Sequence, residues 1–304
     1  MQRIFHPELI SLDKIDIPLF TESNINVDVL RLDKIHPVIS GNKYFKLKYH
    51  LQNAIENKFE GILTFGGAWS NYIVATACTA SLHQLKSIGI IRGENTTARS
   101  NTLRQAEEFG MQLEFISRIM YRDIHTNEYK KELANRFPQY YIIPEGGSGA
   151  PGIKGASEIP GLVDNNEYTH IICAIGTGTT YCGIVNASLA TQQITGIPVL
   201  KGISNLYEQY ECYINSPLKK PYCNFFYDYD FGGYAKYDDM LITFMNEFYR
   251  QTNIPTDFIY TGKLFFAVQD LAIKKFFPPG SKVLVIHSGG LQGNSSLDKG
   301  TLNF

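Results

Sequence analysis

The sequence predicts an α/β protein built from two open, twisted, mostly parallel sheets with helices on both faces. Short apolar runs alternate with amphipathic stretches, and glycine-rich turns separate them. That alternation is typical of parallel strands connected by crossover helices. The pattern stops at a glycine-rich segment, residues 145–152, and then begins again. We therefore expect two α/β domains with a ligand-binding cleft between them.

The first series of elements belongs to a smaller domain, residues 50–150. The run GILTFGG is apolar and ends in two glycines, whereas ARSNTLRQAEEFG has the apolar spacing of an amphipathic helix stopped by a glycine. A helix that begins near Lys43 and continues through Ile55 leads into this series. The spacing predicts strands at 61–67, 86–92, 112–116 and 140–143, and helices at 70–82, 98–110 and 123–137.

The second series belongs to a larger domain, residues 1–49 together with 151–304. Two of its strands lead into turns of small residues, Gly176–Thr180 and Ser288–Gly290. Open parallel sheets bind ligands at the carboxyl ends of their strands, so these turns are candidate ligand sites. The predicted strands are 170–175, 199–203 and 282–287, and the predicted helices are 181–192, 238–250 and 263–277.

Composition and charge narrow the class of protein. Hydrophobic residues make up 44% of the 304 residues and charged residues 19%, as in soluble globular chains. A formal net charge of −1 provides no broad basic surface for nucleic acid or an anionic membrane. The five cysteines form no C-x-x-C pair, the first residues lack a signal-peptide pattern, and no apolar run could span a bilayer. We expect a cytoplasmic protein without nucleic-acid or membrane partners.

Two common kinds of catalytic centre are not indicated. The seven histidines include no H-E-x-x-H motif, and no His/Cys cluster has the spacing of metal ligands. No G-x-S-x-G motif points to a serine hydrolase. We therefore expect no bound metal and look for the chemistry in four other motifs.

The first candidate motif, SGNKYFKL, places Lys43 at the start of a helix. The positive field of a helix N-terminus and partial burial both disfavour the charged form of a lysine. A neutral amine can form a Schiff base with an aldehyde. The alternative is an ordinary solvated lysine beside an asparagine N-cap, and this motif alone does not decide between the two.

The second motif, GGAWSN, follows the predicted strand at 61–67. Its two glycines allow the backbone to approach a ligand closely. The hydroxyl of Ser70 and the amide of Asn71 then lie beside the free N–H groups of the next helix, which together suit a carboxylate. The alternative is a serine N-cap with no ligand.

The third motif is a loop of small and hydroxyl-bearing residues between an apolar strand and a helix. Backbone N–H and side-chain O–H groups in such a loop can surround a phosphate, which we favour over a plain turn. It is not a nucleotide-binding P-loop, because no G-K-[ST] follows, and Tyr181 stands where G-x-G-x-x-G needs a glycine. The loop residues are Gly176, Thr177, Gly178, Thr179 and Thr180.

The fourth candidate is a pair of turns, YTGK from Tyr260 and HSGG from His287, that each follow an apolar run. Each turn places polar groups at the end of a buried stretch. Considered alone, a buried tyrosine hydroxyl and a capping serine are the simpler interpretations.

Taken together and in this order, the motifs resemble the family of 1-aminocyclopropane-1-carboxylate deaminases and D-cysteine desulfhydrases, pyridoxal-phosphate enzymes of the tryptophan-synthase-β type. The shared patterns are S-G-N-K-x-x-K-L, G-G-x-x-S-N, G-T-G-T, Y-x-G-K and H-x-G-G, and they run from about Val29 to the last strand. The resemblance implies fold type II of these enzymes, with pyridoxal 5'-phosphate in the interdomain cleft and held by the larger domain. It also implies a small amino-acid substrate and a homodimer.

The resemblance assigns roles to the residues of the first two motifs. Lys43, rather than Lys46 or Lys48, looks like the Schiff-base lysine. Asn71 is placed like the family residue that bonds the ring hydroxyl of the cofactor. Ser70 is placed like the residue that receives the substrate carboxylate.

The remaining motifs complete the implied site. The loop Gly176–Thr180 matches the phosphate cradle, Tyr260 matches an active-site tyrosine, and Tyr234 falls where the family has a second one. Cyclopropane deaminases carry a glutamate and a leucine at two positions that are Thr261 and Ser288 here. Hydroxyls at these cofactor-binding positions resemble the desulfhydrase branch. A hydroxyl near the pyridine nitrogen makes the cofactor a weaker electron sink than a carboxylate does, which suffices for loss of a thiolate.

Three hypotheses follow for the function. The favoured one is α,β-elimination from D-cysteine to pyruvate, sulfide and ammonia, with Lys43 or a tyrosine removing the α-proton. The second is deamination of 1-aminocyclopropane-1-carboxylate to 2-oxobutanoate and ammonia. Trp69 and Tyr72, bulkier than is usual in the family, leave the substrate open. The third, from another class, is a non-catalytic protein that binds a phosphorylated metabolite through Gly176–Thr180.

Overall fold

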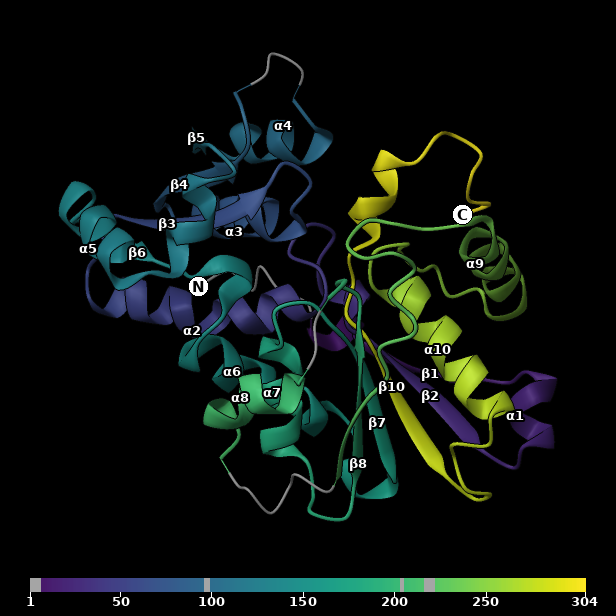
Figure 1. Cartoon of the computed structure of the whole chain (residues 1–304). Coiled ribbons are helices and arrows are strands. Elements are labelled where there is room, and N and C mark those ends of the chain that lie inside the picture. Colours follow the sequence, from purple (N-terminus) through teal and green to yellow (C-terminus); the bar gives the residue numbers. More distant parts are fainter. Residues whose placement is uncertain (1–6, 96–98, 203–204, 216–221) are drawn as a thin grey trace.

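The computed structural model describes residues 7–95, 99–202, 205–215 and 222–304, and these contain two separate β-sheets (Figure 1). The larger sheet has the strand order β1-β2-β10-β7-β8-β9, and the smaller sheet has the order β5-β4-β3-β6. Within the described residues, neighbouring strands are parallel except for the pair β1 and β2. Two mostly parallel sheets with helices on both faces confirm the predicted fold class.

The elements follow one another in the alternation that the sequence predicts. The larger sheet consists of β1 (Ser11–Ile15), β2 (Asn26–Arg31), β7 (His170–Ile175), β8 (Gln193–Pro198), β9 (Cys223–Phe225) and β10 (Lys282–His287). The smaller sheet consists of β3 (Gly61–Gly67), β4 (Lys86–Arg92), β5 (Met111–Ile116) and β6 (Tyr140–Ile142). The helices are α1 (Pro18–Glu22), α2 (Asn42–Glu56), α3 (Asn71–Leu82), α4 (Asn101–Glu108), α5 (Asn127–Arg136), α6 (Ala150–Ala156), α7 (Thr179–Ala187), α8 (Leu206–Tyr210), α9 (Asp239–Thr252) and α10 (Thr261–Ile273).

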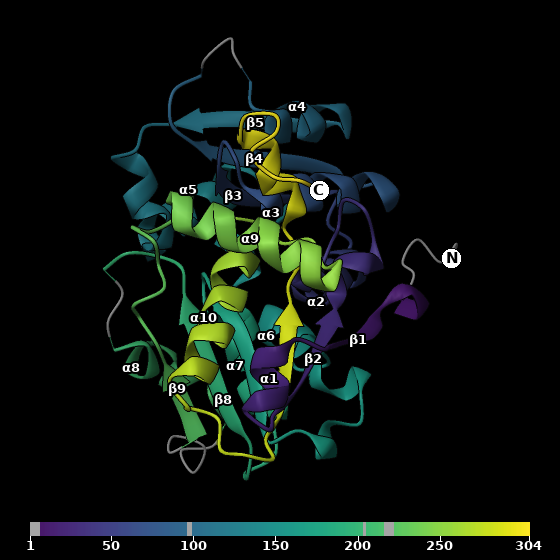
Figure 2. The ribbon, with the colours of Figure 1, turned by 90° about the vertical axis from the view of Figure 1, so that its right-hand side faces the viewer.

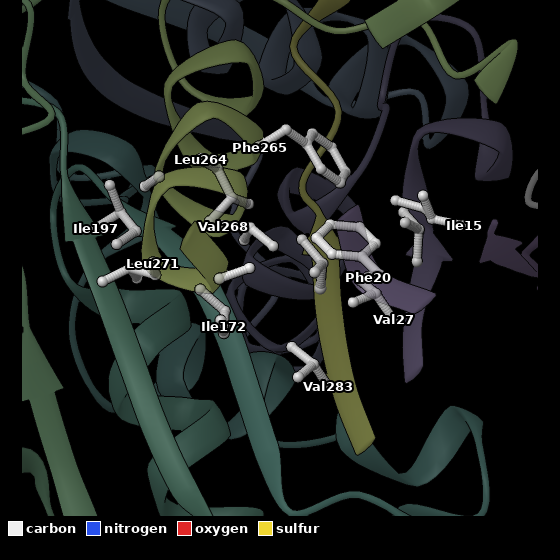
Figure 3. Packing of buried hydrophobic residues seen from close by; sticks show 14 of the residues in the cluster. Ile15, Phe20, Val27, Ile172, Ile197, Leu264, Phe265, Val268, Leu271 and Val283 are labelled. Carbon is white, nitrogen blue, oxygen red and sulfur yellow. The ribbon is translucent and has the colours of Figure 1, made fainter. Parts of the chain in front are cut away.

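Helices cover both faces of the larger sheet. Strand β7 is buried along its whole length, because its side chains point alternately into two apolar clusters. On one face, Leu264, Val268 and Leu271 of α10 share a cluster with Ile172 of β7 and Val283 of β10 (Figure 3). Figure 2 shows α10 in front of this sheet, with α9 above it. Helices α2, α6 and α7 contribute to the cluster on the other face. Each buried Ile, Leu or Val side chain stabilises the fold by roughly 1.5–3 kcal/mol.

The smaller sheet is covered in the same way. Helices α3 and α4 pack on one face, where Ile73 and Leu103 meet Ile91 of β4. A 3₁₀ segment, Met120–His125, and α5 pack on the other face. Helix α2 joins the two layers, because Phe45 belongs to a cluster of the larger sheet and Leu47 to a cluster of the smaller one.

The strand predicted at 199–203 is wrong. Strand β8 ends at Pro198, and Ile203 lies outside the described residues. The strand is difficult to predict from the sequence because it contains Gly196 and Pro198, two residue types that are uncommon in strands. A Cβ atom at position 196 would lie 2.2 Å from Cδ1 of Ile175 on the neighbouring strand, so any larger residue would require that side chain to shift.

Other boundaries also differ from the predicted ones. The helix predicted at 123–137 is interrupted at Thr126, whose hydroxyl accepts a hydrogen bond from the N–H of Tyr129 and caps α5. Helix α7 ends at Ala187 rather than at residue 192. Ala98, where one predicted helix begins, lies outside the described residues. Strands β1, β2 and β9 were not predicted.

The domain boundaries at residues 50 and 150 stay a prediction. The smaller sheet spans residues 61–142, and the larger sheet is formed by residues before and after it. Helix α2 passes through residue 50 without a break.

The carboxyl ends of four strands are directed toward one region. Gly67 ends β3, Arg92 ends β4, Gly176 follows β7 and Ser288 follows β10. All four residues line the same cavity. The cavity therefore lies where parallel sheets usually bind ligands.

Candidate active site

One cavity, of about 370 Å³, lies between the two sheets and is lined by residues from both. It has the size of a small-molecule or cofactor site. Ten of the twelve predicted site residues line it, and the two that do not are Thr179 and Thr261. The ten are Lys43, Ser70, Asn71, Gly176, Thr177, Gly178, Thr180, Tyr234, Tyr260 and Ser288.

Gly41 determines where Lys43 lies. Its φ angle is +69°, and a Cβ atom on this residue would lie 1.9 Å from the carbonyl oxygen of Ser288. Only glycine allows so close a contact with that conformation. The N–H of Asn42 donates to the same carbonyl oxygen at 3.2 Å. The start of α2 is thereby packed against the end of β10, and the Lys43 side chain enters the cavity beside Ser288.

The Lys43 amine is buried, with 7% of the residue exposed. Burial lowers its pKa from 10.5 to about 8, and the nearby carboxylate of Asp257 opposes this shift. A substantial fraction of the amine is therefore neutral close to neutral pH, as a nucleophilic lysine requires.

Lys46 also lines the cavity, one helical turn after Lys43. Burial and the charge of Lys43 lower its pKa from 10.5 to about 7. Its Nζ lies 5.4 Å from the ring centroid of Tyr72. Lys48, in contrast, is paired with Glu158 at 2.7 Å and does not line the cavity. The structure thus leaves two amines that could react with an aldehyde there.

Replacing Lys46 with Met should flatten the pH dependence of stability in the cofactor-free protein. The unfolded chain keeps Lys46 protonated up to about pH 10, whereas the folded protein releases this proton near pH 7. Between these values the unfolded state binds more protons, so the free energy of unfolding rises with pH, by up to about 1.4 kcal/mol per pH unit for one such group. Urea unfolding at pH 7.5 and 9 should show a smaller rise for Lys46→Met than for the wild type.

The exposed lysine Lys130 provides the control for this measurement. Lys130→Met should retain the wild-type rise between the two pH values. Equal rises in the wild type and in Lys46→Met would contradict the prediction.

The start of α3 presents unused polar groups to the cavity. Ser70 is the N-cap residue, but its hydroxyl makes no capping hydrogen bond, so the simple N-cap interpretation does not describe it. Asn71 is buried, and its Nδ2 donates to the carbonyl oxygen of Gly290 at 3.2 Å. The Oδ1 atom of Asn71 has no hydrogen-bond partner among the described residues. A buried acceptor without a donor is costly, and a ligand hydroxyl would satisfy it.

The loop Gly176–Thr180 connects β7 to α7. Gly178 has a φ angle of +77°, and a Cβ atom there would lie 2.1 Å from Cζ of Tyr210. Only glycine fits, and the first N–H groups of α7 remain available for an anion. The hydroxyl of Thr180 accepts from Nδ2 of Asn42 at 2.8 Å. Thr179 bonds Thr177 through the two hydroxyls, 3.1 Å apart, and so supports the loop from outside the cavity.

Tyr234 and Tyr260 lie next to each other, with ring centroids 6.3 Å apart and planes at 71°. Burial raises the pKa of both hydroxyls, so both are neutral proton donors at neutral pH. The two residues are brought together by Lys263, whose buried Nζ donates to the carbonyl oxygens of Asp230 and Gly233, both at 2.7 Å. The lysine of the Y-x-G-K motif thus fastens the loop that carries Tyr234.

Thr261 is directed away from the cavity. Its hydroxyl donates to Oδ1 of Asp257 at 2.8 Å and accepts from the N–H of Asp257 at 2.7 Å. Of the two residues expected to place a hydroxyl at the cofactor, Thr261 and Ser288, only Ser288 lines the cavity.

Sequence reasoning missed Asp257. Its carboxylate is fully buried and accepts hydrogen bonds from the N–H groups of Ile259, Tyr260 and Thr261. It therefore caps the start of α10 and fixes the backbone of Tyr260. An aspartate shortly before the apolar run TGKLFFAV was the signal that could have revealed it.

Sequence reasoning also missed two charged residues in the cavity lining, Arg92 and Glu145. Arg92 ends β4, and Glu145 follows β6. Their position after strands of a parallel sheet was the available signal.

The cavity residues fit pyridoxal phosphate. Lys43 offers an amine with a lowered pKa for the aldehyde, Asn71 offers an unpaired acceptor for the ring hydroxyl, and the loop Gly176–Thr180 offers N–H and O–H groups for the phosphate. No group of three or more His, Cys, Asp or Glu residues in the described parts of the chain could hold a metal ion. None of the described helices is both long and apolar enough to cross a bilayer.

Known proteins resemble the chain over most of its length. A protein of Pyrococcus abyssi, whose name gives 1-aminocyclopropane-1-carboxylate deaminase as a provisional activity, is 29% identical over 90% of this chain and 86% of its own. The mitochondrial bifunctional D-cysteine desulfhydrase/1-aminocyclopropane-1-carboxylate deaminase of Arabidopsis thaliana is 26% identical over 84% of this chain and 70% of its own. The crystal structure of a homologue of the cyclopropane deaminase covers 94% of this chain and 90% of its own, with a TM-score of 0.79 and 23% identity.

A family model also matches the chain, and its description names the cofactor. The model described as "Pyridoxal-phosphate dependent enzyme" matches residues 15–289, which include every predicted site residue. The predicted resemblance is confirmed. The chain therefore belongs to the family of pyridoxal-phosphate-dependent enzymes, and pyridoxal phosphate is its cofactor.

Proposed function

We propose that this protein is a lyase that catalyses α,β-elimination on a small amino acid, with D-cysteine as the favoured substrate. The observation that carries the proposal is the meeting of Lys43, Ser70, Asn71 and the two tyrosines in one cavity with the loop Gly176–Thr180. When bound, pyridoxal phosphate withdraws electrons from the α-carbon of an amino acid, so that its α-proton becomes acidic.

Different residues around the cofactor would bind the substrate carboxylate and transfer the α-proton. The Ser70 hydroxyl and the N–H groups at the start of α3 would hold the substrate carboxylate. The Lys43 amine, whose pKa is lowered to about 8, could take the α-proton. Tyr234 or Tyr260 could instead exchange a proton with the substrate, since both hydroxyls lie in the cavity.

One observation supports the elimination branch over ring opening. Among the described residues that line the cavity, Glu145 alone carries a carboxylate, and it accepts a hydrogen bond from the Tyr121 hydroxyl at 2.7 Å, whereas Asp257 is outside the lining. A cofactor without a carboxylate at its ring nitrogen is a weaker electron sink, which suffices for the loss of a good leaving group such as a thiolate. Deamination of 1-aminocyclopropane-1-carboxylate remains the second candidate, because relatives carry that activity in their names.

Sulfide and pyruvate release from D-cysteine tests the proposal. The yellow holoenzyme should release both in equal amounts, and it should form less 2-oxobutanoate from the cyclopropane amino acid. Lys43→Ala should be assayed in parallel, because free pyridoxal phosphate reacts slowly with thiols. Faster 2-oxobutanoate formation would select the second candidate. A colourless protein that binds phosphorylated metabolites without turnover would favour the non-catalytic alternative.

We also propose that the protein is a cytoplasmic homodimer. The dimer rests on the family resemblance. The compartment is supported by Cys78, Cys173 and Cys182, which are buried free thiols.

A further inference from the structure

Arg92 is a charged group in the cavity lining that the proposed reaction does not use. It stands at the carboxyl end of β4, and one of its guanidinium nitrogens lies 3.5 Å from the point that a Cβ atom of Gly67 would occupy. Gly67 opens the turn that leads to Ser70. The guanidinium therefore lies beside the expected substrate-binding turn. No carboxylate or other hydrogen-bond acceptor contacts Arg92 in the described parts of the chain.

The Arg92 guanidinium contacts the ring of Tyr121, a contact that leaves its N–H groups without an acceptor on that side chain. The guanidinium carbon of Arg92 lies 5.4 Å from the centroid of the Tyr121 ring, a cation–π contact. The hydroxyl of the same tyrosine donates to Oε1 of Glu145 at 2.7 Å. The second carboxylate oxygen of Glu145 lies 3.9 Å from Nε2 of His125. Glu145 and Arg92 thus contact different parts of Tyr121 and make no ion pair with each other among the described residues.

Arg92 lies at the open end of the cavity. Lys43, Asn71 and Ser288 form its buried part, whereas Trp69 is 42% exposed, Tyr234 is 38% exposed and Arg92 is exposed. A group at the far end of a substrate's side chain that reached this open end would meet the Arg92 guanidinium. The α-carboxylate already has donors at Ser70 and the start of α3. Arg92 is therefore suited to a second negative charge.

We propose that Arg92 forms an anion subsite, which binds a negatively charged group at the far end of the substrate's β-substituent. The inference rests on the proposed elimination and adds that amino acids whose β-substituent ends in an anionic group are better substrates than their neutral counterparts. In the reaction the bond between Cβ and the leaving heteroatom breaks, the electron pair leaves with that atom, and the α-proton passes to the enzyme. Water then converts the remaining three-carbon fragment to pyruvate and ammonia.

A matched pair of substrates tests the subsite. S-carboxymethyl-cysteine and S-carbamoylmethyl-cysteine differ only in an anionic carboxylate against a neutral amide, and both release a thiolate and pyruvate. The wild-type holoenzyme should prefer the carboxylate by about tenfold in kcat/KM, the value expected for one charge-assisted hydrogen bond at a partly exposed site. Both the D and the L forms should be assayed, because the subsite does not fix the configuration at the α-carbon.

Three variants test whether Arg92 causes the preference for the anionic substrate. Arg92→Gln should reduce the ratio of the two kcat/KM values to about one, and Arg92→Lys, which keeps the charge, should restore part of it. Arg118→Gln, at an exposed arginine that follows β5 and does not line the cavity, should keep the wild-type ratio. A wild-type ratio near one would overturn the proposal. An equal loss on both substrates in Arg92→Gln would also overturn it, because Arg92 would then serve the shared α-carboxylate or the fold.

Binding can be followed without turnover in the inactive Lys43→Ala variant, because Trp69 is the only tryptophan and lines the cavity. Quenching of its fluorescence by the two compounds should give a dissociation constant about tenfold lower for the anionic one, and Arg92→Gln should remove that difference. If neither compound nor D-cysteine yields pyruvate, the proposed elimination fails. The fluorescence titration would still decide whether Arg92 binds anions.

Discussion

Replacing Lys43 with Ala is expected to lower kcat/KM for the true substrate by at least about 1000-fold and to prevent covalent attachment of the cofactor. Lys43 is buried in the cavity beside Ser288, and burial lowers its pKa to about 8. An alanine can neither form a Schiff base nor move a proton. Reduction of the yellow holoenzyme with borohydride, followed by peptide mass spectrometry, should place the cofactor label on Lys43 in the wild type and on no residue in the variant.

Two other lysines of α2 serve as a control and as the competing site for the cofactor label. Lys48→Ala should keep the label and most of the activity, because Lys48 pairs with Glu158 outside the cavity. Lys46 lines the cavity, and its pKa is lowered to about 7, so it could also react with an aldehyde. A label on Lys46 in the wild type would contradict the assignment of Lys43.

The sequence predicted the parts of the site that depend on local backbone geometry. The turn before Lys43 was recognisable because Gly41 must adopt a positive φ angle against Ser288, which no other residue type tolerates. The loop at Gly178 was recognisable for the same reason, since a side chain there would collide with Tyr210. A position that tolerates only one residue type can be recognised in the sequence. The two sheets were predicted because strands buried on both faces are continuous apolar runs.

The residues that were missed depend on contacts between distant segments. Thr261 was expected at the cofactor, but its hydroxyl is bound to Asp257, and no pattern in the sequence distinguishes these two directions. The link from Lys263 to the loop of Tyr234 spans about thirty residues and ends on backbone carbonyls, which any sequence provides. Strand β8 was misplaced because it contains Gly196, which packs closely against the side chain of Ile175 on another strand. Tertiary contacts, rather than local preference, decide these positions.

Replacing Asp257 with Ala is expected to lower the free energy of unfolding by about 3 kcal/mol or more. The variant leaves the N–H groups of Ile259, Tyr260 and Thr261 without their acceptor in a fully buried place, where each unsatisfied donor costs about 1–3 kcal/mol. Asp238→Ala is the matched control, because Asp238 caps α9 with one hydrogen bond to the N–H of Leu241 and is exposed. Its loss should cost only about 1 kcal/mol in the same urea titration. Equal costs in the two variants would contradict the prediction.

Asp257→Asn separates the charge of this residue from its hydrogen bonds. An asparagine keeps one acceptor oxygen for the start of α10, so the protein should fold, but the negative charge near Lys43 is lost. Because that charge raises the pKa of Lys43 against the effect of burial, its removal should shift the pKa further below about 8. In the cofactor-free protein, acylation of Lys43 should therefore begin at a lower pH than in the wild type. A purely structural role would leave this pH profile unmoved, whereas a shift to lower pH would establish that Asp257 adjusts the pKa of the amine that we propose holds the cofactor.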